Sequence, residues 1–309
     1  MSELSERPEL SEKPALPQRP AMRARVWYGA VAAAVFAVAY HLSLLMRWLD
    51  LRRFMPWLLV LGLRNLMEVT LCLLGAAVSH RFGLRRAAAE LGLRTPVVRG
   101  LVFGLLASAP MLVTFALTSS INPAMTPLSV GVGCILAPFA EEVLFRAYLF
   151  RQLYRRARLG FWASALIPSI LFGAGHLYQS TDPGELAGIV LITASGSVLG
   201  CWVFIRWQDS VWPIFALHAL MNLWWEVFAV DDTALGGWMA NGARLATIAI
   251  AVLLTIYRGR IWKPAAAPAA GEASPDGGDR GGPTAYRTRV TRIAPSIPST
   301  ISLQLAPDR

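Results

Sequence analysis

Long apolar segments recur through most of this 309-residue chain and limit what it can fold into. Hydrophobic residues make up 55% of the sequence and charged residues only 16%, whereas an average soluble domain has about 25% charged residues. The mean hydropathy is +0.48. Runs of about 20 apolar residues have the length that an α-helix needs to cross a bilayer, and they do not resemble short alternating barrel strands. The sequence therefore predicts an all-α, polytopic transmembrane helical bundle.

Eight apolar segments define the predicted bundle, which covers residues 23–263. Their approximate spans are 27–48, 56–78, 100–118, 128–153, 161–178, 186–207, 211–230 and 239–262. The flanking tails, residues 1–22 and 264–309, are rich in Pro, Ala, Ser and Gly. Segments of that composition cannot bury a core, so we expect both tails to be disordered.

The net charge of +10 is distributed as membrane topology requires. The loops after the second, fourth and eighth segments are the basic ones: they hold Arg81, Arg85, Arg86, Arg94 and Arg99, then Arg151, Arg155, Arg156 and Arg158, then Arg258, Arg260 and Lys263. The positive-inside rule then places both termini in the cytoplasm. Arg47, Arg52 and Arg53 are the exception, because this topology leaves them outside. We expect no nucleic-acid partner, and the excess of arginine and alanine favours a bacterial plasma membrane.

Two adjacent carboxylates lie inside the fourth segment. A carboxylate in hydrocarbon costs several kcal/mol, with values from about 3 to more than 10, and usually marks a functional site. Glu142 and Arg146 are four residues apart and share a helical face, so they can form an ion pair. Glu141 points about 100° away and lacks that partner. Phe145, one turn later, would give Glu141 the apolar surroundings that suit a general base.

Two histidines and an amide occur in other apolar segments. His176 lies in the fifth segment, and His218 and Asn222 share one face of the seventh. A glutamate near a histidine can deprotonate a water, while a second histidine and an amide can donate to a developing oxyanion. Catalytic groups on segments four, five and seven therefore predict a hydrolytic site. Glutamate with two histidines could instead hold a divalent metal such as zinc, although no HExxH motif is present.

Three ordered motifs resemble those of the CPBP family. This family comprises the type II CAAX prenyl endopeptidases and the Abi proteins of bacteriocin processing or self-immunity. The resemblance covers residues 128–225 and rests on Glu141-Glu142-x-x-x-Arg146, Phe172-x-x-x-His176 and His218-x-x-x-Asn222. It implies an intramembrane endopeptidase that acts on a peptide or membrane-protein substrate in the lipid bilayer. Peptide maturation and bacteriocin self-immunity are the implied roles, beside cleavage of prenylated proteins.

The resemblance also implies a role for each motif residue. Glu141 would activate water, His176 would orient it, and His218 with Asn222 would stabilise the oxyanion. Supporting roles fall to the remaining motif residues, which are Glu142, Arg146 and Phe172. The family is labelled a metalloprotease, and a metal-free glutamate mechanism is also proposed for it. If a metal binds, the implied ligands are His176, His218 and one of the two glutamates.

Two other readings stay open at this point. Arg64 and Glu68 in the second segment could belong to an ion path in a transporter, although no internal repeat supports one. The chain could also be a non-catalytic membrane scaffold. Thr193-Ala-Ser195-Gly196 resembles the GxSG motif of rhomboid proteases, but small residues in membrane helices more often serve packing.

Helix lengths also pose a question about depth. Glu141 lies fifteen residues before Arg156 and His218 lies seven residues after Val211. At 1.5 Å per residue these positions are about 22 Å and about 10 Å from the expected cytoplasmic ends of their helices. Straight helices would therefore leave the two side chains at different depths.

Overall fold

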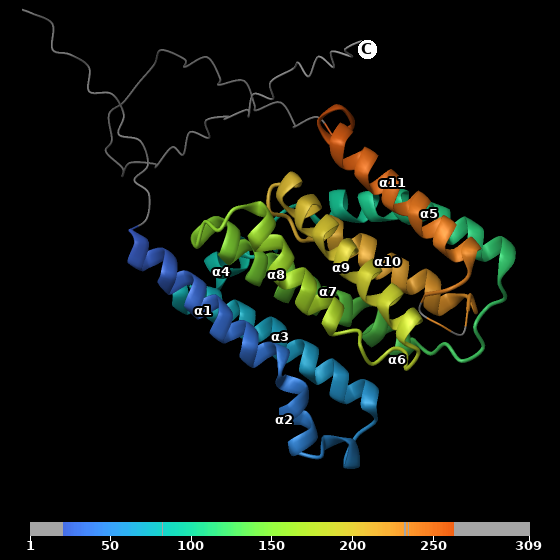
Figure 1. The fold of residues 1–309 in the computed structure, drawn as a ribbon, viewed down its shortest axis with the longest axis horizontal. Helices are drawn as coiled ribbons and strands as arrows, with labels where there is room; N and C mark the ends of the chain where they lie inside the picture. Colours follow the sequence, from blue (N-terminus) through green and yellow to red (C-terminus); the bar gives the residue numbers. More distant parts are fainter. Residues whose placement is uncertain (1–20, 82, 232, 234, 263–309) are drawn as a thin grey trace, which may run out of the picture. The chain divides into compact units, whose positions relative to one another are not determined.

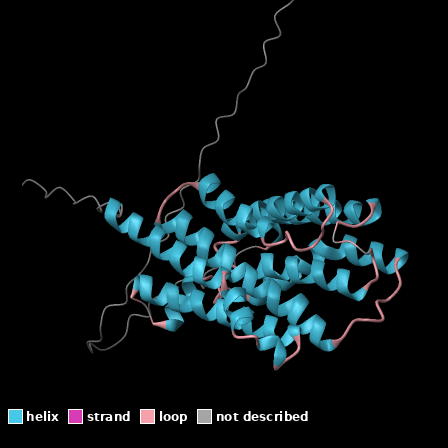
Figure 2. Ribbon diagram, turned by 60° about the horizontal axis from the view of Figure 1, so that its bottom comes forward, coloured by secondary structure: helices cyan, strands magenta, loops and turns pink. Residues whose placement is uncertain are grey.

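The computed structural model of this protein describes residues 21–262, apart from residues 82, 232 and 234. Within these residues the chain forms helices and connecting loops, with no strand (Figure 2). The predicted all-α fold is confirmed. Residues 1–20 of the predicted N-terminal tail and the whole predicted C-terminal tail, 264–309, lie outside the described residues.

Every predicted apolar segment is helical in the structure. The elements are α1 (Met22–Tyr40), α2 (Leu42–Trp48), η1 (Leu51–Arg53), α3 (Trp57–His80), α4 (Leu84–Glu90), α5 (Val97–Thr118), α6 (Pro127–Ser129), η2 (Val130–Leu136), α7 (Ala137–Glu141), η3 (Glu142–Phe150), η4 (Gln152–Arg156), α8 (Phe161–Ala174), α9 (Pro183–Arg206), α10 (Trp212–Val227) and α11 (Trp238–Ile261). Six of the described helices are long and apolar enough to cross a membrane, as a multi-pass membrane protein requires. Helices α8 and α10 are shorter, at 14 and 16 residues.

The fourth segment is one long helix, α6 to η4, in which α-helical and π-helical stretches alternate. In η3 the N–H of Arg151 bonds to the carbonyl of Arg146, five residues earlier. Such π-helical turns are rare in proteins, and those that occur are often at functional sites. The helix changes from α to π geometry between Glu141 and Glu142. The regular 100° spacing assumed for these two side chains therefore does not describe this segment.

The helices pack pairwise around the long helix. Helix α1 lies along α3, α8 along α9, and α5 between α10 and α11 (Figure 1). Helix α5 approaches α10 closely at Gly104, which has no side chain. A Cβ built on Gly104 would lie 2.6 Å from the Cβ of Ala216. The position of α10 is therefore tied to α5.

A charged network joins the basic end of the long helix to two neighbouring loops. Arg151 and Arg156 pair with Glu90 at the end of α4. Arg151 and Arg155 pair with Asp209 in the loop before α10, and the Arg155 Nη2 lies 2.8 Å from Asp209 Oδ1. These ion pairs hold the end of α4 and the loop before α10 against one end of the long helix.

Helix α10 consequently begins inside the protein. Val211 is fully buried, and the indole N–H of Trp212 donates to the carbonyl of Leu93 in the covering loop. The start of α10 therefore does not lie at the protein surface, whereas the depth estimate treated it as the cytoplasmic end of the helix. His218 then reaches the level of the glutamates in the long helix.

Candidate active site

The two adjacent glutamates occupy different environments. The side chain of Glu142 is 1% exposed and its Oε1 lies 3.0 Å from Nη1 of Arg146. The predicted ion pair is thus present. Both residues border one cavity, but the side chain of Glu141, at the end of α7, is 25% exposed. Glu142 is a buried ionic group, whereas Glu141 can meet a substrate.

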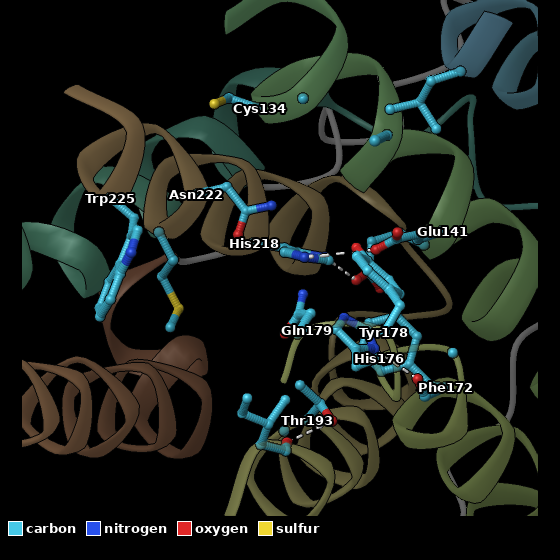
Figure 3. Close-up of a pocket in the computed structure, with 18 of the residues that line it drawn as sticks. Cys134, Glu141, Phe172, His176, Tyr178, Gln179, Thr193, His218, Asn222 and Trp225 are labelled. Carbon is cyan, nitrogen blue, oxygen red and sulfur yellow. Dashed lines mark hydrogen bonds and ion pairs between the residues drawn. The ribbon is translucent and has the colours of Figure 1, made fainter. Parts of the chain in front are cut away.

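His218 contacts both glutamates, one with each ring nitrogen (Figure 3). Its Nδ1 lies 2.8 Å from Oε1 of Glu142. A carboxylate only accepts hydrogen bonds, so Nδ1 carries the proton in this contact. Its Nε2 lies 3.7 Å from Oε2 of Glu141. The ring is therefore oriented by the buried glutamate and presents Nε2 to the accessible one.

His176 lies in a turn just beyond the end of α8, rather than within the helix. Its Nδ1 donates to the carbonyl oxygen of Phe172 at 2.8 Å. A backbone carbonyl cannot donate, so this bond leaves Nε2 as the nitrogen available to another group. His176 lines the same cavity as Glu141.

The ring of Phe172 packs between three polar side chains of the site. Its centroid lies 4.8 Å from that of His176 and 6.2 Å from that of His218. The guanidinium carbon of Arg146 sits 4.6 Å from the same centroid, as in a cation–π contact. Phe172 thus supports both histidines and the buried cation. Phe145 packs instead against other aromatic rings, including Phe172, in the core.

The cavity has a volume of about 950 Å³, at the upper end of the range for ligand sites. Asn222 lines it one turn beyond His218 on α10 (Figure 3). Sequence reasoning missed other polar residues of the lining, among them Gln179, Glu226 and Arg244. Gln179 follows His176 by three residues, but nothing in its local sequence marks it as part of a site.

The implied metal ligands do not form a metal site in this arrangement. Among the described residues no three His, Cys, Asp or Glu side chains are grouped to hold one ion. Each histidine keeps Nε2 available because its Nδ1 is engaged with a carbonyl or a carboxylate, but these nitrogens are not grouped with a third such donor. Because no third donor converges with them among the described residues, the residues present do not fit a bound metal.

The serine of the rhomboid-like motif lies elsewhere. Ser195 is exposed on α9 and does not line the cavity. Its neighbour Ser197 is buried and accepts a hydrogen bond from Ser169 of α8. These small residues serve the packing of α8 on α9.

Comparison with known proteins agrees with the resemblance carried by the motifs. Residues 123–224 match the family described as "Type II CAAX prenyl endopeptidase Rce1-like". This match covers about a third of the chain and supports its resemblance to the CPBP family. The matched residues include Glu141, His176, His218 and Asn222. The family predicted from three motifs is therefore confirmed for this part of the chain.

A curated relative supports the same assignment. The chain is 33% identical over 96 residues to "Putative membrane peptidase YdiL" of Bacillus subtilis (strain 168). The aligned region covers 31% of this chain and 35% of that protein, so the chain spans about a third of the relative's length. No solved structure matches the chain significantly.

Proposed function

We propose that this CPBP-family protein is an intramembrane endopeptidase that hydrolyses peptide bonds with a water activated by Glu141. The observation that carries the proposal is the division of labour between the glutamates. Glu142 is buried between Arg146 and His218, while Glu141 faces the cavity 3.7 Å from Nε2 of His218. The carboxylate of Glu141 is thus free to exchange protons with the water that attacks the substrate.

The reaction begins with transfer of a water proton to the carboxylate of Glu141. The resulting hydroxide attacks the carbonyl carbon of the scissile peptide bond and forms a tetrahedral oxyanion. Glu141 then returns the proton to the leaving nitrogen as the C–N bond breaks, which releases an amine and a carboxylic acid. A positioned general base contributes about 10²–10⁴-fold to such a rate.

His218 and Asn222 are the candidate donors to the oxyanion. When both ring nitrogens of His218 carry a proton, Nε2 donates to the oxyanion while Nδ1 donates to the carboxylate of Glu142. Asn222 lies one turn further along α10 and brings an amide donor to the same cavity. His176, with Nδ1 held by the Phe172 carbonyl, offers Nε2 to orient the attacking water.

The substrate class follows from the lining of the cavity and its place in a membrane protein. Many of the lining side chains are large and apolar, such as Met46, Trp57, Leu61, Ile189, Ile192, Leu199, Leu217, Met221 and Trp225. An apolar peptide or a membrane-protein segment, with or without a prenyl group, fits this surface. In a bacterial plasma membrane, peptide maturation or bacteriocin self-immunity would use such an activity.

The test is a comparison of membrane peptides from strains that carry the wild type, Glu141→Gln or Glu226→Gln. Glu226 lines the same cavity but accepts a 2.6 Å hydrogen bond from Ser129, so it controls for loss of a cavity carboxylate. We expect uncleaved precursors to accumulate only with Glu141→Gln. A Glu141→Gln strain that is indistinguishable from wild type, while a deletion strain is impaired, would establish the scaffold role instead.

A further inference from the structure

Arg64 of α3 faces the same cavity as Glu141 and is held by two buried neighbours. Its Nε lies 3.0 Å from Oε1 of Glu68, and its Nη2 donates to Oδ1 of Asn65 at 3.2 Å. Glu68 and Asn65 are both buried within the bundle. A buried carboxylate in a membrane helix is costly. Glu68 is therefore paired with Arg64 on the same helix, and this pairing orients the arginine.

Part of the Arg64 guanidinium remains available to a ligand. Nη1 has no hydrogen-bond partner among the described residues, the side chain is 28% exposed, and it lines the cavity. Arginine presents five N–H donors in a planar fork that matches a carboxylate. Helix α3, which carries Arg64, also packs against α7, whose last residue is Glu141. The oriented donors of Arg64 therefore lie in the neighbourhood of the proposed base.

Two further arginines line the cavity from α2 and η1. Arg47 and Arg52 are exposed at its rim, and neither makes an ion pair within the described part of the chain. Together with Arg53, these residues contradict the positive-inside rule in the predicted topology. Binding of an anionic group would account for basic residues at this end of the molecule.

We infer that Arg64, with Arg47 and Arg52 at the rim, forms a subsite for a carboxylate of the peptide substrate. The inference rests on the proposed peptidase function and adds a substrate class to it. The preferred substrates are apolar peptides that carry a carboxylate close to the scissile bond. That carboxylate is either the C-terminus of the peptide or an acidic side chain, and both sources offer the same chemistry to a guanidinium.

Peptide binding tests the subsite without relying on cleavage. The protein is prepared with Glu141→Gln in nanodiscs of phosphatidylcholine, so that no anionic lipid competes. The probe is a fluorescent hexapeptide of leucine and alanine in four forms: the free acid, the amide, and two amides with an internal aspartate or asparagine. A charge-assisted contact predicts that one acidic form binds about tenfold or more tightly than its neutral counterpart.

Three further variants in this background locate the preference. Arg64→Gln/Glu68→Gln removes both charges of the ion pair and so leaves no buried carboxylate alone; it should abolish the preference. Arg64→Lys keeps the positive charge but lacks the planar guanidinium, so it should retain only part of the preference for the acidic peptide. Arg53→Gln, on an exposed arginine of η1 that does not line the cavity, should leave the preference unchanged.

The outcomes separate the subsite from the peptidase. Preference for the free acid assigns the C-terminus as the ligand, and preference for aspartate assigns a side chain. Equal binding of all four forms, no binding of any, or an undiminished preference in Arg64→Gln/Glu68→Gln overturns the subsite. If peptide binding depends on Arg64 but the protein that retains Glu141 cleaves no peptide, the subsite is upheld and the proposed peptidase function is wrong.

Discussion

The imidazole of His218 donates a 2.8 Å hydrogen bond from Nδ1 to the buried carboxylate of Glu142. This contact joins α10 to the long helix at the first residue of its π-helical stretch η3. It determines which ring nitrogen faces Glu141. Glu142 is therefore a positioning residue as well as the partner of Arg146.

Glu142→Gln should lower both stability and activity. The substitution leaves Arg146, which is 3% exposed, without its carboxylate, and breaking a buried pair costs about 3–5 kcal/mol. It also removes the charged acceptor of the hydrogen bond that orients the ring of His218. We expect a lower unfolding temperature in detergent and a kcat reduced by about 10²–10⁴-fold. Thermal unfolding and a peptide-cleavage assay measure the two effects separately.

A double variant distinguishes the two roles of Glu142. Glu142→Gln/Arg146→Met removes both buried charges, and such replacements are often neutral or stabilising. Its stability should return close to that of the wild type, while its activity stays low because His218 still lacks the carboxylate. Recovery of activity together with stability would show that Glu142 acts only through the fold.

The sequence predicted the local relations of this site but not those between helices. The pairing of Glu142 with Arg146 follows from a spacing of four residues on one helix. The pairing of Glu142 with His218 joins residues 76 positions apart, and no sequence periodicity encodes that distance. The π-helical stretches and the buried start of α10 depend on tertiary packing in the same way. These two features explain why ideal straight helices placed His218 and Glu141 at different depths, although the two side chains meet in the structure.

Metal chelation is expected to leave cleavage unchanged. No three His, Cys, Asp or Glu side chains converge to hold one ion among the described residues. The proposed mechanism needs only the carboxylate of Glu141 as base. Peptide cleavage is measured after incubation with 1,10-phenanthroline and dialysis. Activity that is lost and then restored by zinc would require a metal-centred mechanism.

The ion pairs of Glu90 predict how stability depends on pH. Burial by itself raises the pKa of Glu90, but the guanidinium groups of Arg151 and Arg156 outweigh it and hold the pKa below its ordinary value of 4.5. A carboxyl with a lower pKa in the folded state stabilises the fold fully above its unfolded pKa. That contribution is lost as the pH falls through the folded pKa.

Glu90→Gln should therefore unfold at a lower temperature than the wild type at pH 7. The difference should shrink as the pH falls below 4.5, because protonated Glu90 loses the same ion pairs in the wild type. Asp50→Asn is the matched control, since Asp50 is exposed and makes no ion pair within the described residues. A difference that stays constant from pH 7 to pH 3 would mean that the charge of Glu90 contributes nothing.

Gly104 sets how closely α5 approaches the helix that carries His218 and Asn222. A Cβ at this position would lie 2.6 Å from the Cβ of Ala216 and 2.7 Å from its carbonyl carbon, so Gly104→Ala must push α10 away. Overpacking of this kind costs about 1–3 kcal/mol, and a displacement of about 1 Å at a catalytic group can cost about 10²-fold in rate. We expect unfolding temperature and kcat to fall together.

Gly242→Ala on α11, where a Cβ meets no atom within 4 Å, should leave activity unchanged and stability unchanged or higher, because alanine favours helix. Full activity in Gly104→Ala would show that the position of α10 does not depend on this contact.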